Sequence, residues 1–174
     1  MRSIRYAVAM SLDAYIAGPD GESDWIVMDP DIDFGEIYSR FDTVLVGRRT
    51  FQAMSRAGRR RVPGMRTVVF SRTLRQGNHP DVTIVAERPV EALVALRSQP
   101  GKDLWLFGGG TLFRSLVEAR LVDAVEVAVI PVLLGGGVPL LPPPADRLKL
   151  RLVGTKAFKT GIVALEYATE YGPA

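Results

Sequence analysis

The chain has no cysteine and one histidine in 174 residues. The absence of cysteine excludes disulfide bonds, a thiol nucleophile and a thiolate metal site, and it fits a cytoplasmic protein. A histidine-rich metal centre is excluded as well, so no metal cofactor is expected. The single histidine, His79, lies in the turn-like sequence Gly-Asn-His-Pro and is interpreted as a surface loop residue.

Long hydrophobic runs are also absent. No apolar run approaches the roughly 18 residues of a membrane helix, and the N-terminus enters a strand-like pattern directly. Neither a membrane segment nor a signal peptide is therefore expected. The composition, with 47% hydrophobic and 24% charged residues, is that of a globular protein. Because the chain has no repeat and no linker, residues 1–174 are predicted to form a single domain.

The net charge is +3, and the positive excess is concentrated in residues 56–61 (Arg-Ala-Gly-Arg-Arg-Arg). Such a segment can contact nucleic acid. It has no interleaved aromatic residues and lies near no recognisable nucleic-acid motif. A solvated basic loop is the favoured interpretation, and no nucleic-acid partner is expected. The same charge would attract a phosphorylated ligand.

The order of hydrophobic patterns predicts an α/β fold. Strands are predicted at residues 4–12, 43–46, 67–70, 82–85, 104–107 and 122–134, helices from residue 30 and at 48–54, 89–97 and 111–119, and a closing hairpin at 148–156 and 162–169. Alternating strands and helices are typical of a three-layer α/β/α fold. Its sheet is mostly parallel and twisted, and the hairpin forms an antiparallel edge.

The sequence supports more detailed predictions for a long loop, the helix that follows it and one apolar run. The loop at residues 13–30 contains Trp25 and has the length of a functional lid. Asp29 is expected to cap the next helix, with Pro30 in its first position. One buried face is predicted for four residues at helical spacing: Phe34, Ile37, Tyr38 and Phe41. The almost wholly apolar run at 122–134 predicts a central strand buried on both faces.

Three segments that follow predicted strands carry groups suited to phosphate: residues 47–50, 71–73 and 108–111. Glycine permits close approach, helix starts offer free N–H groups, and hydroxyls and guanidinium groups bind anions. The glycines at 108–110 could equally be a packing device. Three such segments at one sheet edge favour a ligand with separated phosphates, such as a dinucleotide. An arginine and a serine, with no acid after strand 67–70, favour the 2′-phosphate of NADPH.

Motifs at residues 9–18, 42–51, 68–72, 106–110 and 130–137 carry a resemblance to a known family. The chain resembles the dihydrofolate reductase-like superfamily. Within it, the chain is similar to the C-terminal reductase domain of the bifunctional riboflavin-biosynthesis protein, RibD. The resemblance covers nearly the whole chain.

The resemblance implies that NADPH is the hydride donor and that the loop at 13–25 is a mobile lid. The positions that match the family's cofactor contacts are Ala9, Ile16, Gly47, Arg48, Arg49, Thr50, Ser71, Arg72, Gly108, Gly109, Gly110, Thr111 and Leu112. Residues 47–50 would contact phosphates, 71–72 the 2′-phosphate and 108–112 the pyrophosphate. Ala9 and Ile16 would line the nicotinamide. The resemblance, the hairpin and the apolar strand also favour a homodimer.

Two positions depart from the family's pattern. Dihydrofolate reductases carry an acid five residues after the lid tryptophan, where this chain has Pro30, so dihydrofolate is disfavoured as a substrate. The riboflavin-type reductases carry a glutamate just before the Gly-Gly, where this chain has Phe107. Four residues either form a largely apolar substrate wall or belong to the core: Met10, Trp25, Phe34 and Phe107.

No catalytic residue is assigned, because the cofactor carries the chemistry and solvent could supply a proton. Asp13 is a candidate for ordering the lid or contacting substrate, or else a loop-start cap. Asp33 borders the helix stripe and could point into a pocket. Asp29 and Asp31 are interpreted as helix-start acids. Residues 135–137 (Gly-Gly-Gly) form either a second anion site or a flexible turn.

The favoured function is an NADPH-dependent reductase of a small heterocyclic or carbonyl substrate, resembling 5-amino-6-(5-phosphoribosylamino)uracil reductase. One alternative is an NADP-binding protein without that activity, since neither expected substrate acid is present. A dihydrofolate reductase and a basic nucleic-acid-binding module are less favoured.

Overall fold

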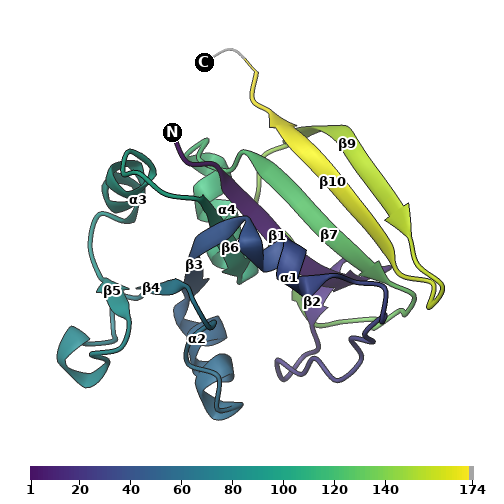
Figure 1. The fold of residues 1–174 in the computed structure, drawn as a ribbon, viewed down its shortest axis with the longest axis horizontal. Coiled ribbons are helices and arrows are strands. Elements are labelled where there is room, and N and C mark those ends of the chain that lie inside the picture. Colours follow the sequence, from purple (N-terminus) through teal and green to yellow (C-terminus); the bar gives the residue numbers. More distant parts are fainter. Residues whose placement is uncertain (173–174) are drawn as a thin grey trace.

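The structure, a computed structural model, describes residues 1–172, and its centre is an eight-stranded sheet with the order β5-β4-β3-β6-β1-β7-β10-β9 (Figure 1). The sheet strands are β1 (Ile4–Ser11), β3 (Phe41–Gly47), β4 (Arg66–Phe70), β5 (Thr83–Val85), β6 (Asp103–Gly108), β7 (Ala124–Ile130), β9 (Lys149–Ala157) and β10 (Val163–Glu170). The six strands from β5 to β7 in this order run parallel, and β10 pairs antiparallel with both β7 and β9. The predicted parallel sheet with a C-terminal antiparallel hairpin is confirmed.

Helices cover both faces of the sheet. They are α1 (Phe34–Ser39), α2 (Arg48–Arg56), α3 (Pro89–Arg97) and α4 (Gly110–Glu118), with a short 3-10 turn, η1 (Gln76–Asn78). Side chains of α3 and α4 pack in one buried cluster with Leu104 and Leu106 of β6, whereas those of α1 and α2 pack in a second cluster with Trp105. Successive side chains of a strand point to opposite faces, so the two clusters lie on opposite sides of the sheet. The three-layer α/β/α prediction is confirmed.

A second, smaller sheet was not predicted. It pairs β2 (Tyr15–Ala17) with β8 (Val138–Pro139) in antiparallel register. The close contact requires glycine at position 137, because a Cβ there would lie 2.2 Å from the carbonyl oxygen of Ala17. Elements this short leave no periodic signal in a sequence. They nevertheless bring the loop after β1 against residues 135–139.

The helix expected to start at Pro30 begins instead at Phe34. Asp33 caps it and accepts a 2.9 Å hydrogen bond from the Glu36 amide. The interpretation of Asp29 as the cap was wrong, because Asp29 is buried and accepts hydrogen bonds from Thr160 in the β9–β10 turn. The predicted buried face is also wrong, because α1 has no buried residue, Tyr38 is 39% exposed and Phe41 belongs to β3.

The predicted strand at residues 122–134 is shorter than expected. β7 ends at Ile130. Three of its residues are half-buried rather than enclosed: Glu126, Ala128 and Val129. Pro131 follows, and proline has no N–H with which to continue a ladder. The chain then leaves the sheet, with Leu133 68% exposed. The prediction of a long strand buried on both faces was therefore wrong.

A charge network joins α1 to the sheet. Arg40, the C-cap of α1, donates to Glu126 of β7 at 2.6 Å, and Glu126 also accepts from Arg5 of β1 at 2.7 Å. Arg5 pairs further with Asp103 at 2.8 Å and Glu166 at 3.0 Å. Burial lowers the pKa of Arg5, but these hydrogen bonds outweigh it and hold the pKa above its ordinary value. Because α1 has no buried residue, this network is a principal attachment of the helix.

None of the helices within residues 1–172 has the length and apolar character needed to cross a membrane.

Candidate cofactor and substrate site

The three predicted phosphate segments lie on neighbouring strands. The turn after β4 carries Ser71 and Arg72, the turn after β3 leads into α2, and the turn after β6 leads into α4. Since β4, β3 and β6 are adjacent and parallel, all three turns lie at the same edge of the sheet (Figure 1). This carboxyl edge is where α/β sheets bind ligands.

Two helices start side by side at this edge without side-chain caps. Gly47 is the N-cap of α2 and Gly109 that of α4, and neither helix has an acidic residue in its first turn. The first N–H groups of each helix therefore lack intrahelical partners and carry the positive end of the helix dipole. An anion bound here would meet N–H groups from both helices.

The glycines at 108–110 were expected either to bind phosphate or to permit close packing, and the three differ in this respect. Gly110 is a packing glycine, because a Cβ there would lie 2.5 Å from the carbonyl oxygen of Pro139 and 2.8 Å from Cδ of Pro142. Gly108 and Gly109, joined by a cis peptide, instead face Thr50 of α2, whose Oγ1 would lie 3.3 Å from a Cβ at position 109. These two leave the helix starts open.

Arginines surround the helix starts. Arg48, Arg49 and Arg72 are exposed, and none of them forms an ion pair within residues 1–172. Ser71 is buried, and its Oγ accepts hydrogen bonds from the amides of Thr73 (3.3 Å) and Leu74 (3.1 Å), while its contact with a 2′-phosphate stays a prediction. It closes the turn that presents Arg72.

Two other predicted cofactor positions lie on the first turn of α4. Thr111 is exposed at the helix start, whereas the Leu112 side chain packs against the core cluster on the α3 and α4 face. Leu112 can therefore offer a cofactor its backbone but little of its side chain.

Ala9 and Met10 of β1 point to opposite faces of the sheet. Ala9 pairs with Ala128 of β7 and faces the α1 side, while Met10 packs in the cluster beneath α3 and α4. Of the two alternatives predicted for Met10, substrate wall or core, the structure supports the core, because Met10 lies on the opposite face of the sheet from Phe107. Ile16 is half-buried on β2, beside β1.

Phe34 and Phe107 belong to a series of aromatic rings between α1 and β6. Phe34 lies 5.9 Å from Tyr38, Tyr38 lies 5.5 Å from Trp105, and Trp105 meets Phe107 edge-on at 5.0 Å, measured between ring centroids. The Trp105 Nε1 donates to the Ala7 carbonyl at 2.8 Å, so its polar atom is satisfied. Sequence reasoning missed Trp105, although the alternation of β6 places it on the same face as Phe107.

Both aspartate candidates for catalysis accept hydrogen bonds from the protein itself. Asp33 is the exposed cap of α1. Asp13 accepts from the Ser11 hydroxyl at 2.6 Å, from the Gly135 amide at 2.7 Å and from the Leu134 amide at 3.1 Å. The hydrogen bond from Ser11 contributes most to lowering the pKa of Asp13, and the two amides contribute further. Asp13 thus occupies the Gly135 N–H, one of the groups that a substrate phosphate would need at residues 135–137.

The loop at residues 18–33 is fastened at its far end. Asp29 accepts from the Thr160 hydroxyl at 2.7 Å and from the Thr160 amide at 3.1 Å. The Asp31 carboxylate lies 3.9 Å from the ammonium of Lys159, which precedes Thr160 in the β9–β10 turn. The middle of the loop is largely exposed, with Trp25 half-buried and its Nε1 donating to the Glu22 carbonyl at 3.2 Å. The loop is therefore anchored to the hairpin beyond Trp25, and the role of residues 13–25 as a lid stays a prediction.

A sequence comparison decides the family. The profile of the RibD C-terminal domain matches residues 2–164. The chain belongs to the RibD C-terminal domain family. Uncharacterized protein YyaP of Bacillus subtilis is 32% identical to this RibD C-terminal domain over 178 residues, covering 95% of the chain and 94% of YyaP.

Solved structures share the fold of this RibD C-terminal domain. A putative riboflavin biosynthesis protein from Shewanella sp. PV-4 superposes with a TM-score of 0.83 at 24% identity, over 98% of this chain and all (100%) of that one. Dihydrofolate reductase from Enterococcus faecalis, solved with NADP(H), superposes with a TM-score of 0.69 at 21% identity, over 96% and 94% of the two chains. The dihydrofolate reductase-like fold is confirmed.

Replacing Asp29 with asparagine should lower the melting temperature by about 3–6 °C at neutral pH, because a charge-assisted anchor is lost. The folded pKa of Asp29 lies below its ordinary 3.8, mainly because of the Thr160 hydroxyl. The carboxylate's contribution is therefore complete above the unfolded pKa and is lost as pH falls through the folded pKa.

Calorimetric melting temperatures should show a constant difference between the wild type and Asp29→Asn from about pH 5 to 7, shrinking below about pH 4. Asp31→Asn is the matched control, since its partner Lys159 is exposed, and it should change little at any pH. A difference between wild type and Asp29→Asn that does not vary with pH would contradict this account of the anchor.

Proposed function

We propose that the protein is an NADPH-dependent reductase that transfers hydride to a small, flat and largely apolar ring. The observation that carries this proposal is the pair of uncapped helix starts at Gly47 and Gly109, at the sheet edge that also carries arginines without an ion pair within residues 1–172. Membership of the RibD C-terminal domain family supports a reductase in general terms.

The residues present fit a dinucleotide phosphate. N–H groups of α2 and α4 would hold the pyrophosphate, with Thr50 beside them, and Arg48 and Arg72 would bind the 2′-phosphate. The turn after β4 offers no carboxylate that would favour a free 2′-hydroxyl. The NADP(H) bound by the Enterococcus faecalis dihydrofolate reductase supports this choice.

The substrate side differs from a riboflavin-pathway site by its lack of an acid. Phe107 stands before the Gly-Gly, and the wall between α1 and β6 is aromatic. Such a surface stacks a planar ring and excludes water, but it cannot accept hydrogen bonds from amino or ribosyl groups. Because Asp13 and Asp33 are engaged elsewhere, the proton comes from solvent.

NADPH, when bound, supplies a hydride. Ala9 would leave room for the nicotinamide because it adds a single methyl group to the β1 face. Phe34 and Phe107 would orient the substrate ring. These residues position and desolvate the reacting groups, which is the protein's main contribution in a cofactor-dependent reductase.

The double substitution Arg48→Ala/Arg72→Ala should raise the Kd for NADPH by about 100-fold or more, because two charge-assisted contacts to phosphate are lost. The Kd for NADH should change by less than about threefold. Isothermal titration measures both. Arg56→Ala/Arg59→Ala removes the same charge from the end of α2 and should leave NADPH binding nearly unchanged. Equal losses for NADPH and NADH would refute the 2′-phosphate assignment.

Substrate preference can be tested by NADPH oxidation with a panel of quinones, pterins, dihydrofolate and ribosylaminouracils. A quinone-like ring should give the highest kcat/KM, about tenfold or more above a ribosylaminouracil. Phe107→Glu should lower or reverse the ratio of kcat/KM for the quinone to that for the ribosylaminouracil. Phe107→Leu, which stays apolar, should not favour the uracil. Tight NADPH binding with no oxidation of any compound would favour the alternative of an NADP-binding protein without turnover.

We further propose a homodimer that covers strand β9. This edge strand exposes Leu150 (41%), Leu152 (52%) and Val153 (55%), and exposed apolar edges tend to pair. Sedimentation equilibrium should give twice the 19.0 kDa of one chain. Leu150→Lys/Leu152→Lys should yield a monomer, while Val94→Lys on α3 should not. A wild-type monomer at micromolar concentration would overturn the proposal.

A further inference from the structure

Two segments of opposite charge reach the carboxyl edge of the sheet. The basic segment, residues 48–75, includes α2 and β4 and carries nine arginines and no acid. The acidic segment, residues 13–36, runs from the end of β1 into α1 and carries eight acids and no lysine or arginine. The basic segment supplies two of the three proposed phosphate turns, whereas the acidic segment leads into the helix that carries Phe34. The sign of the charge therefore changes between the cofactor half and the substrate half of the candidate site.

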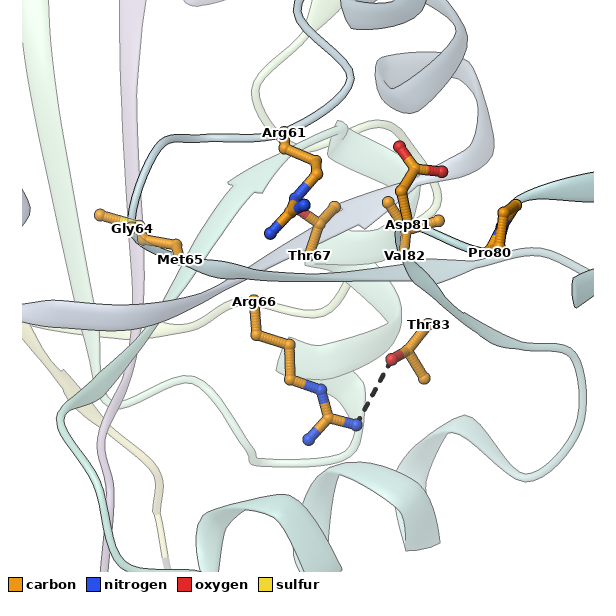
Figure 2. A pocket seen from close by; sticks show the side chains of 9 residues that line it. All are labelled: Arg61, Gly64, Met65, Arg66, Thr67, Pro80, Asp81, Val82 and Thr83. Atoms are coloured by element: carbon orange, nitrogen blue, oxygen red, sulfur yellow. Dashed lines mark hydrogen bonds between the residues drawn. The ribbon is translucent and has the colours of Figure 1, made fainter.

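The arginines of the basic segment are not neutralised by the protein itself. None of them forms an ion pair within residues 1–172. Arg66, which Figure 2 shows with Arg61 in a recess at the amino ends of β4 and β5, donates to the neutral Thr83 hydroxyl at 3.4 Å. In the proposed function, NADPH would bring about three to four negative charges to Arg48 and Arg72. Positive charge near the site would then be largely matched by phosphate.

Acids at the start of α1 lie close to the aromatic wall. Asp31, Asp33 and Glu36 are exposed. Each is within three residues of Phe34, so their Cα atoms lie within about 11 Å of its Cα. Asp31 has one ion pair, a 3.9 Å contact with the exposed Lys159, and the other two acids have none within residues 1–172. Exposed charges at such distances interact through water, and salt screens them.

We infer that the substrate is an uncharged or cationic ring and that the acidic segment discriminates against anionic rings. The inference rests on the substrate side of the proposed function and narrows its substrate class. Arg40, at the end of α1, does not offset the acids, because it is paired with Glu126 at 2.6 Å. A substrate with a phosphate or carboxylate would approach against the negative potential, which slows its association. Dihydrofolate and phosphorylated ribosylaminouracils are disfavoured on this ground too.

The test compares three naphthoquinones that differ only in a side chain ending in methyl, sulfonate or trimethylammonium. With saturating NADPH, kcat/KM for the sulfonate should rise about threefold or more between about 0.01 M and 0.3 M NaCl, because salt screens the repulsion. The trimethylammonium compound should lose about threefold, and the methyl compound should change by less than about 1.5-fold. Each compound is compared with itself, so differences in ring reactivity do not affect the result.

The double substitution Asp31→Asn/Glu36→Gln removes two of these charges and keeps the Asp33 cap of α1. At low salt it should raise kcat/KM for the sulfonate, relative to the methyl compound, about twofold or more. The matched control is Glu118→Gln/Glu170→Gln, which removes the same charge from exposed positions at the ends of α4 and β10, on the amino edge of the sheet. It should leave the ratio at its wild-type value.

Redox-inert naphthalenes with the same three side chains separate this result from turnover. With NADP⁺ bound and at low salt, isothermal titration should give the lowest Kd for trimethylammonium and the highest for sulfonate. That order of Kd without reduction of any quinone would overturn the reductase proposal and leave the charge discrimination standing. Equal salt dependence of the three compounds, tightest binding of the sulfonate, or neither binding nor reduction would overturn the charge discrimination. If the double variant fails to fold, the salt dependence of the wild type decides.

Discussion

At the carboxyl edge of the sheet, the turns after β3 and β6 lie in close contact. A Cβ at Gly47 would lie 3.8 Å from the amide nitrogen of Gly109 and 3.8 Å from Cβ of Leu112. This approach follows from β3 and β6 being neighbours in the sheet. It sets two helix dipoles side by side. The positive character of the site therefore comes from backbone geometry as well as from arginine side chains.

The two halves of the candidate site differ in how firmly they are held. The cofactor half stands on strands and helices that bury Phe51 of α2 and Phe113 of α4, and the ring of Phe113 stacks on Tyr6 at 3.9 Å. The substrate half includes α1, a short helix without buried residues. Its attachments are the Asp33 cap, the contact of Tyr38 with Trp105 and the pairing of Arg40 with Glu126. Adjustment to different substrates is easier on such an element than on the core.

Much of the fold could be predicted because its signals are local. Alternating strand and helix patterns, the hairpin and the three strand-end segments were read from neighbouring residues. The role of Asp29 could not be predicted, because its partner Thr160 lies 131 positions away. The early end of β7 had a signal in Pro131 that the apolar run concealed. The position of Met10 also had a signal, since strand alternation places it opposite Ala9.

The hydrogen bonds between Asp29 and Thr160 make one unit of two segments from opposite ends of the chain. Their geometry depends on the length of the β9–β10 turn as much as on the length of the loop that holds Trp25. A turn longer or shorter by one residue would move the Thr160 amide and hydroxyl away from the carboxylate. Loop grafting between relatives of this chain must therefore exchange both segments together.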